Sequence, residues 1–121
     1  HTVVFRNFRR GGFDLVTLKN GTVYIHEVKY GAKALQRSKF TAITTFMRSN
    51  VNEVLGTLRG NTNLSRADKT LVQNTFLQYL HGTAPNNLRI QITHYGEANL
   101  GPRLWNALTM ESGLPIDFVK F

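Results

Sequence analysis

Asp14, Glu27 and Lys29 are the residues whose types and spacing could do chemistry in this chain. The first 52 residues carry nine lysines and arginines but only two carboxylates, which are Asp14 and Glu27. Lys29 follows Glu27 by two positions, so the two would share one face of a strand. Two carboxylates and a lysine in a positive field can hold a divalent cation against a phosphodiester. The question is then whether the fold brings the two acids together.

A β-hairpin is the element that must position the two acids. Residues 13–18 and 22–30 are rich in β-branched and aromatic side chains, which are typical of strands. Asn20 and Gly21 stand between them, and Asn-Gly is the strongest short hairpin signal because a type I′ turn needs positive φ at both central positions. The sequence therefore predicts an antiparallel hairpin around a tight turn.

The length of the turn sets the register. With two turn residues, Val16 lies opposite Ile25, and Asp14 lies opposite Glu27 at a non-hydrogen-bonded position, where Cα atoms are about 4.5 Å apart. A three-residue turn would instead place His26 opposite Asp14. We prefer the two-residue register because it matches apolar residues with apolar residues at two successive positions on one face.

Neutralisation of the acid pair decides what the site can bind. Two opposed carboxylates are destabilising unless a metal ion, a cation such as Lys29 or a shared proton offsets their repulsion. An oxygen-rich carboxylate site suits Mg²⁺ or Mn²⁺ better than Zn²⁺. We therefore expect a divalent metal, with Mg²⁺ first among the three.

Composition bounds the class of protein. At 121 residues the chain is expected to form a single domain over residues 1–121, and its start at His1 rather than Met suggests a C-terminal fragment of a longer chain. The absence of cysteine excludes disulfides, Cys-ligated zinc and thiol chemistry. No apolar run is long enough for a transmembrane helix. The net charge of +8 is concentrated, with +7 in residues 1–52, and this concentration predicts a polyanionic partner.

The remaining elements complete an α/β domain built on a mixed sheet, with helices that follow the hairpin and pack on it. Periodicity and capping signals predict the following elements: a strand at Val3–Phe5, a helix over Ala34–Arg59, a helix from an N-cap at Ser65 (with Asp68 at N3) to a stop at Gly82, a strand over Leu88–Tyr95, a short helix over Pro102–Met110 and a last strand over Ile116–Phe121.

Three histidines receive separate interpretations. His26 falls on the other face of the hairpin, and we expect it to have a packing or surface role there. His81 is expected at the C-terminal end of a helix, where the dipole favours it. His94 ends a strand and could reach the acidic site.

The acids and the elements around them resemble the PD-(D/E)XK nuclease superfamily, which includes restriction endonucleases, resolvases and many bacterial toxin nucleases. The resemblance rests on Asp14 followed across a hairpin by Glu27-Val28-Lys29 and then by a helix. It covers residues 3–95 and implies a restriction-endonuclease-like core, namely a helix, a three-stranded meander, a helix and a further strand. Two departures are that Phe13 replaces the family's proline and that no acidic helix precedes the hairpin.

Carried over residue by residue, the resemblance implies roles for the site. Asp14 and Glu27 would ligate the metal, and the carbonyl of Val28 would add a further ligand. Lys29 would position or activate the attacking water, and Gln36 would lie near the site from the first turns of the next helix. Five basic residues are candidates for nucleic-acid contacts, although the first two of them could equally form a solvated turn: Arg9, Arg10, Lys33, Arg37 and Lys39.

The resemblance implies a metal-dependent endonuclease that hydrolyses DNA or RNA, with tRNA among the substrates of such toxins. It further implies a toxin module of the polymorphic or contact-dependent inhibition kind, secreted or delivered from a bacterial surface and acting in the target-cell cytoplasm. An acidic immunity protein would be its partner by charge complementarity. The alternatives are a basic nucleic-acid-binding module without catalysis and, less compatible with the charge, a glycosidase using paired carboxylates.

Overall fold

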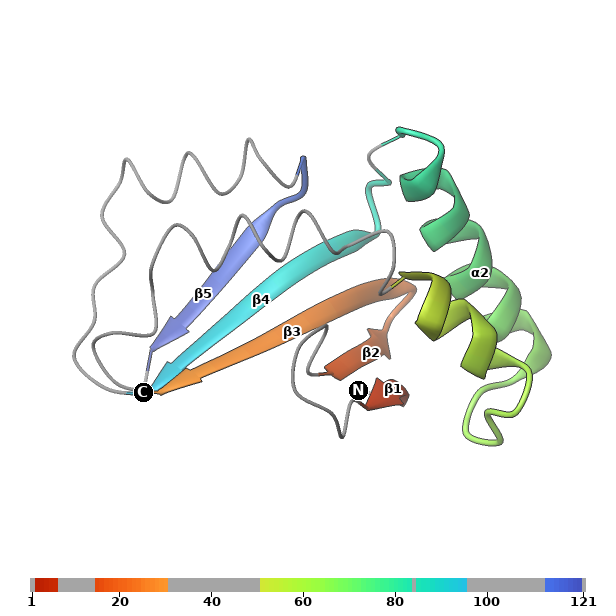
Figure 1. Cartoon of the computed structure of the whole chain (residues 1–121), viewed down its shortest axis with the longest axis horizontal. Coiled ribbons are helices and arrows are strands. Elements are labelled where there is room, and N and C mark those ends of the chain that lie inside the picture. The colour runs from red at the N-terminus through yellow and green to blue at the C-terminus, as the bar shows by residue number, and fades with distance from the viewer. Residues whose placement is uncertain (1, 7–14, 31–50, 84, 96–112, 121) are drawn as a thin grey trace.

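One mixed sheet with two helical segments makes up the part of the chain that the computed structural model describes, which is residues 2–6, 15–30, 51–83, 85–95 and 113–120. The strands run in sheet order β1-β2-β3-β4-β5, and residues 51–58 form a helical stretch ahead of α2 (Figure 1). The α/β class is therefore as predicted. The elements are β1 (Thr2–Arg6), β2 (Leu15–Lys19), β3 (Thr22–Tyr30), α2 (Arg66–Leu80), β4 (Leu88–Tyr95) and β5 (Ile116–Lys120).

Strand β3 is the place where the sheet changes from antiparallel to parallel pairing. β1 with β2 and β2 with β3 are antiparallel, whereas β3 with β4 and β4 with β5 are parallel. The carboxyl ends of β3, β4 and β5 consequently lie together at one end of the sheet, away from α2 (Figure 1). β3 therefore has an antiparallel neighbour on one side and a parallel neighbour on the other.

The turn between β2 and β3 has the predicted chemistry. Asn20 has a φ of 51° and Gly21 a φ of 77°, as a type I′ turn requires. The register runs from Lys19 opposite Thr22 to Leu15 opposite His26. Since His26 is paired with Leu15, the two-residue register is confirmed and the three-residue alternative is excluded.

The hydrophobic core lies between the sheet and the two helical segments. Alternate residues of the central strands are fully or almost fully buried, and the helices contribute small aliphatic side chains and one phenylalanine. Such alternation is expected of a sheet that packs one face on helices. The most buried core residues are Val16, Val23, Ile25, Val51, Val54, Val72, Phe76, Leu88 and Ile92.

Local polar contacts fix where α2 begins and how β1 is held. The Ser65 hydroxyl oxygen accepts a hydrogen bond from the Asp68 backbone N–H at 3.1 Å, which confirms the predicted N-cap. At the other end Gly82 adopts a φ of 88°, as a helix stop requires. In the loop before α2, the Asn61 amide donates to the Val4 carbonyl at 3.0 Å and thereby ties this loop to the edge strand.

The predicted short helix over 102–110 lies outside the described residues, as does the first part of the helix predicted over 34–59. The last part of the helix predicted over 34–59 is described and is helical, over residues 51–58. Within the described ranges, every helix falls short of the length and apolarity needed to span a membrane.

Candidate functional site

The end of β3 carries three consecutive residues of the predicted site. Glu27, Val28 and Lys29 belong to the last four residues of β3, which ends at Tyr30. Their described backbone partners are on β4, where Glu27 pairs with Ile92 and Lys29 with His94. The described pairing of β3 with β2 stops one residue earlier, at His26. These residues therefore lie just past the hairpin, where parallel pairing continues.

Asp14 is the residue immediately before β2, and it lies outside the described residues. The register of the hairpin holds from the turn to the pair of Leu15 with His26. One further step in that register would set Asp14 opposite Glu27, so their proximity stays a prediction. The other predicted site residues outside the described part of the chain are Arg9, Arg10, Lys33, Gln36, Arg37 and Lys39.

Among the side chains that the structure describes, no three of the His, Cys, Asp or Glu type come together in a way that could hold a metal ion. Asp14 and the side chain of Glu27 are not in that set, so this observation does not bear on the predicted metal site.

A polar cluster surrounds His26 on the face of the sheet opposite to the one that bears Ile25. Thr17 is 3% exposed and His26 9% exposed, and the Thr17 hydroxyl lies 2.7 Å from the His26 Nε2 atom. Burial lowers the pKa of His26 below its ordinary value of 6.5. The ring centroid of Tyr24 lies 6.1 Å from that of His26. The predicted packing role of His26 is confirmed, since its ring is almost enclosed.

An ion pair that the sequence did not predict joins β4 to β5. The Arg89 Nε and Nη2 atoms donate to the two carboxylate oxygens of Asp117 at 2.8 and 2.9 Å. The hydrogen bond raises the pKa of Arg89 and lowers the pKa of Asp117. Both side chains are more than a third exposed, at 35% and 42%, so the pair contributes little to the stability of the fold.

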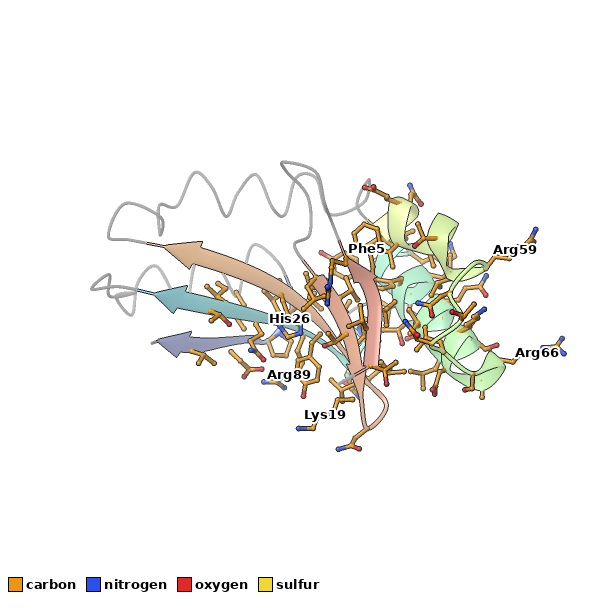
Figure 2. The ribbon with its side chains drawn as sticks, turned by 90° about the horizontal axis from the view of Figure 1, so that it is seen from below. Phe5, Lys19, His26, Arg59, Arg66 and Arg89 are labelled. Carbon is orange, nitrogen blue, oxygen red and sulfur yellow. The ribbon has the colours of Figure 1, made fainter. Side chains whose placement is uncertain are left out.

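A basic pocket between the helical segments was also missed by the sequence interpretation. It has a volume of about 290 Å³, and Leu55 and Leu58 provide the apolar part of its lining. Arg59, Lys69 and Gln73 complete its lining, and the Lys69 ammonium donates to the Arg59 carbonyl at 3.3 Å. Figure 2 shows Arg59 on this helical layer, far from His26 and Arg89 on the sheet. The pocket is therefore separate from the end of β3.

Comparison of the chain with protein-family models, with curated proteins and with solved structures finds no match in any of the three.

Proposed function

We propose that this chain is a metal-dependent nuclease that hydrolyses phosphodiester bonds in DNA or RNA, with its site at the end of β3. The observation that carries the proposal is the hairpin register, which holds from the turn to the pair of Leu15 with His26. Continued by one step, that register would set Asp14 opposite Glu27, with Lys29 two residues further along β3. The register thus favours the two carboxylates sharing one cation.

The topology around β3 supports this location. In open α/β sheets, ligands bind in the crevice outside the carboxyl ends of the strands. The carboxyl end of β3 lies at one end of the sheet together with those of the parallel strands β4 and β5 (Figure 1). An antiparallel meander that is followed, after the helical segments, by a further strand is also the order that the resemblance implies.

The donor set fits a hard divalent cation. Two carboxylates, from Asp14 and Glu27, and the carbonyl of Val28 are all oxygen ligands, which suit Mg²⁺ or Mn²⁺. When bound, such an ion polarises a phosphoryl oxygen and acidifies its bound water. Lys29 contributes a fixed positive charge where negative charge grows on the phosphate as water attacks phosphorus and the bond to the leaving oxygen breaks.

The charge of the whole chain is consistent with a polyanionic substrate. The net charge is +8, and basic residues outnumber acidic residues nine to two in the first 52 positions. A positive field raises the local concentration of nucleic acid and speeds encounter. The same field would suit an acidic inhibitor protein, which is the partner that we propose for a nuclease of the toxin kind.

Glu27→Gln is the decisive substitution, because it keeps the shape of the side chain and removes its charge. With Mg²⁺ present, we expect cleavage of plasmid DNA or total RNA to fall by more than about 100-fold, since loss of a direct ligand should cost at least as much as loss of the groups that support one. Glu53→Gln, in the helical stretch 51–58, is the matched control and should cleave like the unaltered chain. A chelator should stop cleavage by both the unaltered chain and this control.

A nucleic-acid-binding module without catalysis is the second candidate, and the same charge distribution favours it. It predicts salt-dependent binding of nucleic acid with no cleavage under Mg²⁺, Mn²⁺ or Zn²⁺. Undiminished cleavage by a purified Glu27→Gln protein would remove the acid pair from the mechanism altogether.

A further inference from the structure

Three basic residues stand in one register row across the parallel strands. Lys29 of β3 pairs with His94 of β4, and His94 pairs with Lys120 of β5. Each of them lies at the last or second-last residue of its strand. The row therefore crosses the carboxyl ends of the three strands, which point to the same end of the sheet in Figure 1.

On the same face of the sheet, the residues that lie closer to the helices are apolar. Ile25, Ile90 and Ile116 form the corresponding row four residues earlier, and their exposures are 0%, 3% and 8%. Four strand residues span about 13 Å. Over that short distance all three strands change from buried isoleucine to a basic residue, so the change is a property of the sheet end and not of one strand.

Gathering like charges in this way is unfavourable without a counter-charge. Neighbouring strands are about 4.8 Å apart, so the backbones of Lys29 and Lys120 are roughly 10 Å from each other. This separation is comparable to the screening length of about 8 Å at physiological ionic strength, so positive charges carried at these two positions are only partly screened from each other. A bound anion would attract both positive charges and so offset their mutual repulsion.

We propose that Lys29, His94 and Lys120 form a phosphate-binding row that holds the sugar–phosphate backbone of the substrate. The inference rests on the proposed nuclease site and adds two substrate-binding residues to it, one from β4 and one from β5. A lysine ammonium offers three donors, and a histidine ring offers an N–H in either tautomer. Both form strong hydrogen bonds with phosphate oxygens when the donor is charged. The sugar–phosphate backbone of the substrate would then run across the strand ends, with the phosphodiester bond to be cut beside Glu27.

Binding measured without cleavage separates this row from the catalytic proposal. With a chelator present to prevent cleavage, the affinity of the protein for labelled single-stranded DNA and RNA oligonucleotides is measured over a range of salt concentrations. Loss of one phosphate contact should reduce the slope of log K against log salt by about 0.7 for single strands. We expect this for Lys120→Gln, together with a smaller loss of affinity for His94→Gln. Arg66→Gln, on the far helical layer (Figure 2), removes one unit of charge without removing a contact and should reduce the slope by less.

Three outcomes decide the matter. Slopes for Lys120→Gln and His94→Gln equal to that of Arg66→Gln, or no binding by the unaltered chain, would overturn the row. Glu27-dependent cleavage with an unchanged KM in both row variants would remove the row and leave the nuclease proposal standing. Reduced salt slopes in the row variants of a protein that does not cleave nucleic acid would support the phosphate-binding row and contradict the nuclease proposal. Lys120→Arg keeps the charge and should restore the slope, which separates charge from folding.

Discussion

At the scale of single residues, His26 is the clearest case of a side chain whose chemistry the fold suppresses. Its ring is almost enclosed, it contacts the Thr17 hydroxyl at 2.7 Å, and burial lowers its pKa. A buried neutral imidazole is a cost to the folded state whenever the unfolded chain can take up a proton. The residue therefore links the stability of the hairpin to pH.

We predict that stability falls as the solution is acidified through the range of His26. The unfolded chain binds the proton near pH 6.5, whereas the folded chain binds it only at lower pH. The free energy of unfolding should thus be highest above 6.5 and decline below it until the lowered folded pKa is passed. Urea denaturation at several pH values between about 5 and 8 measures the slope.

Two substitutions interpret that measurement. His26→Gln can still form a hydrogen bond to Thr17 but does not titrate, so the decline over this window should disappear. His81→Gln, at the exposed end of α2, should keep it. Asp117 acts in a separate window, because its pKa is lowered from 3.8 by Arg89 and its contribution is lost only near and below that value. A decline that survives in His26→Gln would contradict the assignment.

At the scale of elements, what the sequence could predict depended on whether the signal was local. Turn residues and caps act within a few positions, so the hairpin register and the start of α2 at Ser65 were predicted correctly. The pair of Arg89 with Asp117 depends on β4 lying beside β5, and no local pattern encodes that choice. The pairing of Lys29 on β3 with His94 on β4 was not predicted for the same reason, although each residue was considered separately as a candidate for the site.

Two glycines test how far local conformation governs these elements. A Cβ added at Gly21 or at Gly56 would meet no atom within 4 Å, so space is equal at the two sites. Gly21 has a φ of 77°, whereas Gly56 lies within the helical stretch 51–58. We predict that Gly21→Ala destabilises the fold by about 1–2 kcal/mol, and that Gly56→Ala stabilises it by about 0.5–1 kcal/mol. Thermal unfolding of both variants measures the two signs, and equal signs would refute the argument.

At the scale of the whole molecule, net charge is expected to affect how fast the chain associates with the proposed polyanionic ligand more than how slowly it dissociates. The exposed Arg59 and Arg66 lie on the helical layer, far from the end of β3 (Figure 2). Their charges contribute to the long-range field while lying outside the proposed contact row. Steering of this kind changes association rates and is screened by salt.

We predict that the double variant Arg59→Glu, Arg66→Glu slows association with nucleic acid and leaves dissociation unchanged. Two charge reversals of two units each reduce the net charge from +8 to +4. The association rate at low salt should fall by about 3- to 10-fold, and the difference should vanish at high salt. Stopped-flow binding measures both rates. A faster dissociation would show that these arginines contact the ligand, and this would move the binding surface to the helices.

The double pairing of β3 also has a consequence for the order in which the molecule assembles. Its antiparallel neighbour is reached through a two-residue turn, which closes in about 1–10 μs. Its parallel neighbour is separated from it by the whole chain from residue 31 to residue 87, and pairings of such long range form slowly. The strand end that bears Glu27 and Lys29 therefore lacks its parallel neighbour until β4 pairs with it. Under the proposed function, a nascent or truncated chain would form its hairpin before it could cleave nucleic acid.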